Sequence, residues 1–379
     1  MFRPIAAPLA LRHERVLEHL ERERLDAAVV HDASNLRWLT GFRGSTGLAI
    51  VRPHGVTLVV DGRYGDQARA DVAGLADHGV GVEVVEIRTG VERLDRLALA
   101  TLGTRRVGFE AERLSVAEHQ RWSERIPGDL VPVNGIFEQA RRIKDEGEIS
   151  AIAEACRLAD LALAEVVPLL VQRVTECDLR DELEHRMRRL GAQGPSYPTI
   201  VASGPVHASR PHHQPTRQII DEGHTLVIDV GALVDGYHSD MTRTFIVGAP
   251  TPLQTEVYEV VAAAQRAGLA AVGCGVPVAE LDAACRRVVE ASGFGPWFAH
   301  GASHGVGLDI HEQPFSTPST RHGDGTFLCG DVITVEPGVY RGDLGGVRIE
   351  DLVVLTADGP RVLTTSPKDT PCLPSPPTI

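Results

Sequence analysis

The first third of the chain combines two apolar periodicities, one typical of helices and one typical of strands. Residues 11–25 carry apolar side chains at helical spacing. Residues 47–52 and 56–61 are short apolar runs around the turn 53–55 (Pro-His-Gly), which predicts a hairpin. Further strands are expected at 26–31, 82–87, 107–110 and 130–133, with helices between them. The pattern predicts a small α/β domain.

The rest of the chain begins with a long helical pattern and then becomes rich in strands and turns. A helix is expected from about residue 144 to 173, because Ile149, Ile152 and Ala155 keep helical spacing. Further helices are expected at 178–190, 252–272 and 278–292. We therefore expect an α/β domain over residues 1–138, an α+β domain over 139–366 and a Pro-rich tail over 367–379.

Composition excludes several classes of partner. A chain of 379 residues suits about two domains. The net charge of −13 repels nucleic acid and anionic lipid. No apolar run approaches the ~18 residues that a membrane span needs, and the N-terminus does not read as a signal peptide. These features predict a soluble, cytoplasmic protein that binds neither nucleic acid nor membranes.

The six cysteines show neither a CxxC pair nor the spacing of a disulfide framework. We expect all of them to be free thiols, which fits a reducing cytoplasm.

Two aspartates flank a predicted tight turn. The segments TLVIDVGA and YHSDMTRTFIV lie on either side of an Asp235-Gly236 turn. If the turn is centred there, Asp229 and Asp240 lie on adjacent strands, within about two positions of facing each other. Side-by-side carboxylates repel unless a cation lies between them. Asp229 also interrupts an apolar run, where a lone charge is costly, so ordinary turn-flanking acids are the weaker interpretation.

Two glutamates interrupt a second pair of apolar strands. Glu336 lies in VITVEPGVY and Glu350 in GVRIEDLVVL. Arg348 and Glu350 are two positions apart and share a face of the strand, so a simple ion pair between them is the alternative to a metal ligand. Asp351 is expected to point the other way, into solvent.

Three histidines fall within twelve positions between these hairpins, at His300, His304 and His311, among glycines that permit close backbone approach. Four carboxylates and one imidazole suit two divalent cations, which would activate a bridging hydroxide. The mostly oxygen ligand set favours manganese, with cobalt and zinc as alternatives.

The motifs IDVGALVDGYHSDMTRTF, HGASHGVGLDIHEQP, TVEPGVY and GVRIED together resemble the pita-bread metallopeptidases, in particular the aminopeptidase P and prolidase branch. NLRWLTGFRGSTG, DGRY and VGFE are similar to the N-terminal, creatinase-like domain of the same branch. The resemblance implies a pita-bread catalytic domain, a homodimer, and cleavage of the N-terminal Xaa-Pro bond of peptides with proline second. An Xaa-Pro dipeptidase (prolidase) is the alternative.

The resemblance also assigns roles to individual residues. Catalytic or supporting roles fall on His212, His300, His311 and Arg348, and Tyr237 is a candidate wall of the proline pocket. The metal-ligand role falls on Asp229, Asp240, His304, Glu336 and Glu350.

Two departures and two rival functions accompany this interpretation. Ser303 stands where many relatives have glycine, and His224 where an acid is common. The run Gly301-Ala-Ser303-His304-Gly305 also matches the G-x-S-x-G nucleophile elbow, which needs a strand before it and a helix after it. A serine hydrolase that uses Ser303 and a metal-free binding protein on the same scaffold are therefore the remoter alternatives.

Overall fold

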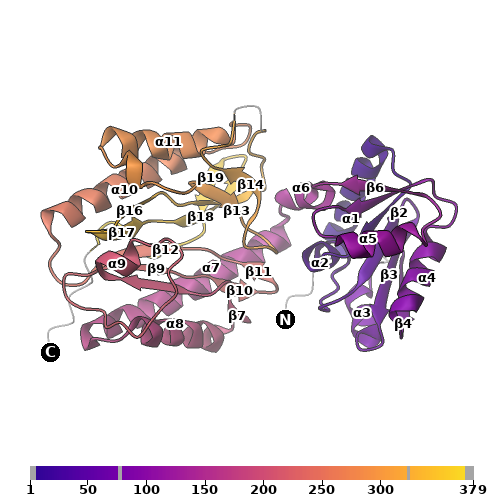
Figure 1. Ribbon diagram of the computed structural model, residues 1–379, viewed down its shortest axis with the longest axis horizontal. Helices are drawn as coiled ribbons and strands as arrows, with labels where there is room; N and C mark the ends of the chain where they lie inside the picture. The colour runs from indigo at the N-terminus through magenta and orange to yellow at the C-terminus, as the bar shows by residue number, and fades with distance from the viewer. Residues whose placement is uncertain (1–5, 76–78, 322–324, 372–379) are drawn as a thin grey trace. The chain divides into compact units, whose positions relative to one another are not determined.

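The computed structural model describes residues 6–75, 79–321 and 325–371, and for residues 6–8 and 171–172 the backbone only. The chain forms two compact units that divide between Arg141 and Arg142 (Figure 1).

The N-terminal unit is built on one mixed six-stranded sheet, in the order β4-β3-β2-β1-β5-β6. The predicted hairpin is confirmed, since β2 and β3 pair antiparallel from Leu48↔Val59 to Arg52↔Gly55. The strands are β1 (Ala27–Val30), β2 (Leu48–Arg52), β3 (Gly55–Asp61), β4 (Val82–Ile87), β5 (Arg106–Glu110) and β6 (Asp129–Val133). The helices are α1 (Ala6–Glu23), α2 (Ala33–Thr40), α3 (Gly65–Val72), α4 (Gly90–Ala100), α5 (Val116–Ser123) and α6 (Ile136–Arg142).

The first half of the C-terminal unit packs two helices against short antiparallel strands. Residues of α7 and α8 form one core with those of β8, β9 and β10. The helices are α7 (Glu146–Val166), α8 (Glu176–Leu190) and the single-turn α9 (Gly204–Ala208). The strands are β7 (Gly194–Pro195), β8 (Ile200–Ser203), β9 (Thr225–Asp229), β10 (Ala232–Val234), β11 (Tyr237–His238) and β12 (Thr242–Ile246).

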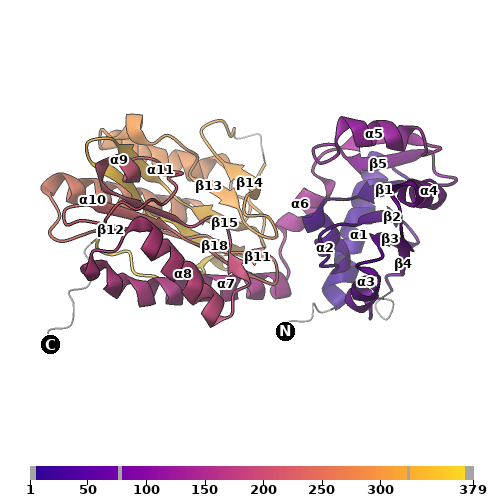
Figure 2. The same cartoon turned by 60° about the horizontal axis from the view of Figure 1, so that its bottom comes forward.

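The second half repeats this arrangement with another helix pair, α10 (Pro252–Ala271) and α11 (Ala279–Ala291), whose core is shared with β15 to β18. Its strands are β13 (Ser303–Gly305), β14 (Glu312–Ser316), β15 (Val332–Val335), β16 (Gly338–Arg341), β17 (Gly345–Arg348), β18 (Asp351–Thr356) and β19 (Gly359–Val362). In both views the strands lie between the pair α7/α8 and the pair α10/α11 (Figures 1 and 2).

Hydrogen bonds join the two halves where β12 meets the segment from β17 to β18. Glu350 N–H donates to the carbonyl of Thr242 at 3.1 Å. Thr244 Oγ1 donates to the Arg348 carbonyl at 2.8 Å and accepts from the Arg348 N–H at 3.0 Å. These bonds bring the ends of strands from both halves, and the acids at those ends, to one place.

The long helix is shorter than expected. Asp145 and Glu148 form a reciprocal cap, so α7 begins at Glu146, and after Val166 the chain continues as a 3₁₀ helix, Val167–Gln172. Pro168 lies at the start of this 3₁₀ segment, and because proline has no N–H it cannot extend the α-helical ladder.

The expectation of free thiols throughout is wrong for two cysteines. Cys274 and Cys329 form a disulfide across 55 residues of sequence. Cys156, Cys177 and Cys285 are free, and Cys372 lies outside the described residues.

The expectation that Asp351 is solvated is also wrong. Its side chain is 0% exposed and pairs with Arg243, whose Nη2 lies 2.8 Å from Oδ1. Gln265 on α10 donates to Oδ2 at 2.7 Å, and Lys368 pairs with the same oxygen. The described part of the Pro-rich tail therefore contacts the body of the unit, and residues 372–379 lie outside the described residues.

Within the described part of the chain, no helix has the length and apolar character that crossing a membrane requires.

Candidate metal centre

The two aspartates lie where a short hairpin joins a longer one. Asp235 and Gly236 both have positive φ, at 46° and 69°, as a two-residue hairpin turn between β10 and β11 requires. Asp229 ends β9 and pairs with Thr242 on β12, so Asp240 lies two residues beyond the position facing Asp229. This is the proximity that the turn predicts.

The two glutamates lie where paired strands change partners. Strand β15 pairs with β18 and β16 pairs with β17, and Glu336 and Glu350 fall in the short breaks between these segments. His304 is on β13, which pairs with β15. Glu336 lies against His304, and Glu350 lies with Asp240 and His304.

The five predicted ligands meet in one cluster. His304 Nε2 lies 3.5 Å from Asp240 Oδ2 and 3.4 Å from Glu336 Oε1. Asp240, His304 and Glu350 each offer a ligand atom within 4.8 Å of the other two. Asp229 joins them through Tyr197, whose hydroxyl lies 2.5 Å from Oδ1 of Asp229 and 2.5 Å from Oδ1 of Asp240.

The acids of this cluster are held in an unfavourable electrostatic environment. Burial raises the pKa of Asp240 well above its usual range, and the neighbouring Asp229 and Glu336 charges raise it further. Burial likewise raises the pKa of Glu350, together with the charge of Asp240, and burial raises the pKa of Glu336. Divalent cations between these carboxylates would remove the repulsion, so the donor set fits such ions.

His304 presents its Nε2 atom to the acids. Its Nδ1 atom lies 3.0 Å from the carbonyl oxygen of Gly305, which can only accept, so Nδ1 carries the proton. Burial lowers the pKa of His304, which favours the neutral ring. A neutral imidazole with Nε2 unprotonated is the form that binds metals.

Arg348 is tied to the cluster through Asp229. Its Nη2 lies 2.6 Å from Asp229 Oδ2 and its Nη1 donates to the Tyr340 hydroxyl at 2.7 Å. His300 Nε2 lies 2.9 Å from the same hydroxyl. Burial raises the pKa of Tyr340 to about 12 and lowers that of His300. The chain His300–Tyr340–Arg348–Asp229 thus links an outer histidine to a predicted ligand.

Two other predicted histidines also lie at the cluster. The ring of His311 stands edge-on to that of His304, with centroids 4.4 Å apart. Burial lowers the pKa of His311 to about 4, and the neighbouring His304 and His212 rings disfavour its charged form further. His212 itself is exposed, and its charge also lowers the pKa of His300.

Tyr237 has a different environment from the one expected. Its hydroxyl donates to Glu148 Oε1 on α7 at 2.9 Å, which accounts for its burial without a substrate. Its role as a wall of the proline pocket stays a prediction.

Sequence reasoning missed several residues of the centre. Tyr197 lies outside the quoted motifs, and Tyr340, the last residue of TVEPGVY, was given no role. Thr242 Oγ1 donates to Glu350 Oε2 at 2.7 Å, and Thr334 Oγ1 accepts from the His304 N–H at 3.1 Å. Each of these contacts comes from another strand or loop, so adjacency in sequence gave no signal.

Ser303 lacks the surroundings of a nucleophile. It is 3% exposed and is the first residue of strand β13, and its Oγ has no hydrogen-bond partner among the residues that the structure describes. A serine nucleophile needs an adjacent base and, in an elbow, a following helix. The geometry gives the serine-hydrolase alternative no support.

Comparison with known proteins covers almost the whole chain. Residues 12–143 match the creatinase/prolidase N-terminal domain, and residues 150–357 match metallopeptidase family M24. An Xaa-Pro dipeptidase from Pyrococcus furiosus is 31% identical over 359 residues, which cover 94% of this chain and 99% of that protein.

Solved structures agree with these matches. An Xaa-Pro dipeptidase from Bacillus anthracis has a TM-score of 0.87 and 32% identity, over 96% of this chain and 100% of that chain. An X-Pro aminopeptidase from Thermotoga maritima has a TM-score of 0.83 and 30% identity, over 93% of this chain and 99% of that chain. The predicted fold class and family resemblance are confirmed: the chain belongs to metallopeptidase family M24, with a creatinase-type N-terminal domain before a pita-bread catalytic domain.

Proposed function

We propose that this chain is a two-metal hydrolase that cleaves the Xaa-Pro bond of peptides with proline second. The observation that carries the proposal is the convergence of three carboxylates on one imidazole nitrogen, with a fourth, Asp229, joined to Asp240 through Tyr197. Relatives described as Xaa-Pro dipeptidases and X-Pro aminopeptidases support the same reaction.

The proposed ligands balance two divalent cations in charge. Four ionised carboxylates carry four negative charges, which two divalent ions would neutralise. The proposed ligands are Asp229, Asp240, His304, Glu336 and Glu350. Manganese is the proposed metal, because oxygen donors outnumber nitrogen, with cobalt and zinc as alternatives.

When bound, such ions supply Lewis-acid polarisation of the scissile carbonyl and lower the pKa of water. The residues of this chain would hold and orient the other partners. Arg348 fixes Asp229 through a charged hydrogen bond, and Thr242 fixes Glu350. With their second oxygens engaged in this way, the carboxylates keep a defined orientation.

The outer histidines would handle the substrate. His311 lies against His304, and His300 is oriented by the Tyr340 hydroxyl. With His212, they can donate to the carbonyl oxygen of the scissile bond or carry a proton to the leaving nitrogen, which is worth about 10²–10⁴-fold in rate for a well-placed group.

We favour an aminopeptidase P-like activity, because the run from His300 to His304 is similar to that branch. Prolidase is the second candidate, since relatives of both descriptions cover nearly the whole chain. A homodimer is proposed on the family resemblance alone, and a cytoplasmic location on the absence of a signal-peptide pattern at the N-terminus.

Metal removal tests the proposal. Chelation should abolish cleavage of Xaa-Pro peptides, and added Mn²⁺ should restore it. Asp240→Asn should lower bound metal, measured by elemental analysis, and abolish turnover while the far-UV circular dichroism spectrum stays unchanged. An active preparation without divalent metal would exclude the mechanism.

A further inference from the structure

A loop from the first half of the catalytic unit brings His212 to the metal centre. The loop comprises residues 204–216, from the short α9 to Thr216. At its tip, Arg348 Nη1 lies 3.5 Å from the carbonyl oxygen of Pro211, directly before His212. His212 is exposed, so contacts elsewhere in the loop must fix its position.

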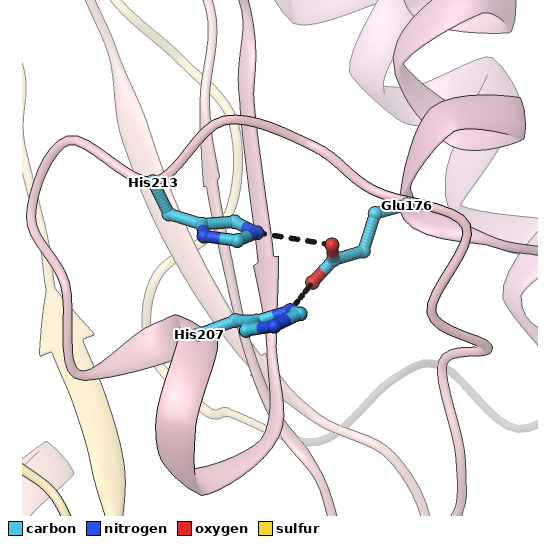
Figure 3. A group of neighbouring side chains, drawn as sticks. All are labelled: Glu176, His207 and His213. Atoms are coloured by element: carbon cyan, nitrogen blue, oxygen red, sulfur yellow. Dashed lines mark hydrogen bonds and ion pairs between the residues drawn. The ribbon is translucent and has the colours of Figure 1, made fainter.

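Those contacts converge on one carboxylate. Glu176, the first residue of α8, is 0% exposed. Figure 3 shows the rings of His207 and His213 directed at its two oxygens. Oε1 accepts from the Ser203 N–H at 2.8 Å and lies 3.0 Å from His207 Nδ1. Oε2 accepts from the N–H and Oγ1 of Thr216, both at 2.9 Å, and lies 3.0 Å from His213 Nε2.

The arrangement requires a carboxylate and not merely a polar side chain. Each oxygen of Glu176 faces a backbone N–H, that of Ser203 or that of Thr216, and neither can become an acceptor. An amide at this position always turns its NH₂ group towards one of them. Burial alone would raise the pKa of Glu176, but the hydrogen bonds from His213, Thr216 and His207 outweigh it and lower the pKa, so the group is ionised at neutral pH.

The same three side chains could in principle hold a cation, because their ligand atoms lie within 4.8 Å of one another. The two rings, however, are stacked, with centroids 4.1 Å apart and planes 23° apart. Near-parallel rings direct their nitrogens side by side towards the two carboxylate oxygens and not to one point between them (Figure 3). The geometry is that of a hydrogen-bond clamp.

We propose that Glu176 is a positioning residue, which fixes the 204–216 loop and so holds His212 at the metal centre. His213, the neighbour of His212, is the direct link between the clamp and the tip of the loop. The catalytic part of this proposal rests on the proposed function, while the structural part does not.

The first test is a double-mutant cycle on the metal-loaded enzyme. Glu176→Gln should lower kcat about 10- to 100-fold, the scale expected when a catalytic group is displaced by ~1 Å. KM should change less than about threefold and both metals should stay bound. In the presence of His212→Ala, Glu176→Gln should have almost no further effect, since residues that act through one another are not additive.

The matched control is Asp178→Asn. Asp178 lies in the same first turn of α8, and its carboxylate contacts Thr175 and not the loop. The Asp178→Asn substitution removes the same charge from the same end of the helix as Glu176→Gln. Its kcat should nevertheless stay within about twofold of wild type.

Hydrogen exchange tests the clamp without relying on activity. The amide hydrogens of residues 204–216 should exchange faster in Glu176→Gln than in wild type. Their exchange rates should be unchanged in Asp178→Asn. If Glu176→Gln does not fold, Thr216→Val removes one hydrogen bond to Oε2 and should produce a smaller change in the same direction.

Several results would overturn the proposal. If hydrogen exchange of residues 204–216 is unchanged in both Glu176→Gln and Thr216→Val, the clamp is excluded. If the losses of kcat from Glu176→Gln and His212→Ala multiply in the double mutant, action through His212 is excluded. A third divalent ion per chain that is lost in Glu176→Gln would make the cluster a metal site instead. If wild type cleaves no Xaa-Pro peptide, the proposed function and the catalytic part of this inference fail together, while exchange still decides the clamp.

Discussion

Arg348 forms its ion pair with Asp229, 119 residues earlier in the chain, and not with Glu350, two residues away. Arg348 Nη2 lies 2.6 Å from Asp229 Oδ2, and the Arg348 side chain is only 4% exposed. Glu350 instead accepts from Thr242 Oγ1. The ordinary ion pair that would have made Glu350 a structural residue is therefore replaced by one that orients a second acid of the cluster.

This relationship predicts the effect of Arg348→Lys. The guanidinium contacts Asp229, Tyr340 and Thr242 at once, whereas an ammonium group cannot reproduce such a fork. We expect a loss of about 10- to 100-fold in metal affinity or kcat/KM, as for other partners of ligating residues. Elemental analysis and peptide kinetics measure the two effects.

Arg341→Lys is the control for this variant. Arg341 also forms a forked pair, but with Asp343, whose side chain is 61% exposed. Exposed pairs contribute little, so activity should not change. An Arg348→Lys enzyme with wild-type metal content and kinetics would show that the pair with Asp229 has no functional role.

Local patterns predicted the strands and the acids at their ends well. The turn at Asp235-Gly236 fixes the hairpin register, and that register brings Asp229 and Asp240 together. The prediction that Asp351 is solvated is wrong. The alternation of side chains along a strand shows which face Asp351 points to, but not what covers that face. Here Gln265 of α10 and Arg243 cover it.

Long-range partners could not be predicted from such patterns. Tyr197 reaches Asp229 and Asp240 across 32 and 43 residues of sequence, and no local motif marks it. The pairing of Cys274 with Cys329 likewise depends on which loops the fold brings together.

The surroundings of Ser303 predict that Ser303→Gly keeps most activity. The Oγ atom is buried without a hydrogen-bond partner among the described residues, so removing it costs no interaction that the structure shows. A nucleophile cannot be removed so easily, because its loss lowers kcat by about 10⁶-fold in a serine protease. Collapse of turnover with metal still bound would restore the serine-hydrolase alternative.

In the N-terminal unit, His31 and Glu110 predict a pH-dependent contribution to stability. His31 Nδ1 lies 2.8 Å from Glu110 Oε2, and Nε2 lies 3.0 Å from the Arg113 carbonyl oxygen. Both ring nitrogens thus face acceptors, which favours the imidazolium. Burial opposes this charge, but Glu110 and the Arg113 carbonyl outweigh it and raise the pKa of His31 above 6.5.

A histidine whose pKa is higher in the folded than in the unfolded protein stabilises the fold fully when the pH is below its unfolded-state pKa. This stabilisation is lost as the pH rises through its folded-state pKa. The free energy of unfolding of wild type should therefore exceed that of His31→Gln most at pH below 6.5, and the difference should shrink at higher pH. Urea titrations of both proteins across this range measure it. A difference that is independent of pH would mean that His31 does not change its charge there.

Substrate preference follows from the chemistry of the X-Pro bond. It is a tertiary amide without an N–H, and the ring restricts the residue after the cut. Peptidases that hydrogen-bond this N–H bind the bond poorly, whereas an apolar pocket with an imidazole near the leaving nitrogen suits it. His300 and His311, which contact Tyr340 and His304, are the imidazoles proposed for this role.

We therefore expect the metal-loaded enzyme to cleave peptides with proline second at least roughly tenfold faster than the alanine analogues, since a methylene-scale fit in an apolar pocket is worth ~1–3 kcal/mol. Comparing kcat/KM for matched Xaa-Pro-Xaa and Xaa-Ala-Xaa peptides measures the preference. Xaa-Pro dipeptides then separate the two subclasses, because release of the first residue from Xaa-Pro-Xaa indicates an aminopeptidase and activity confined to Xaa-Pro indicates a prolidase. Equal rates for proline and alanine would contradict the substrate assignment and leave the metal centre in place, since the pocket and the cation ligands are separate groups of residues.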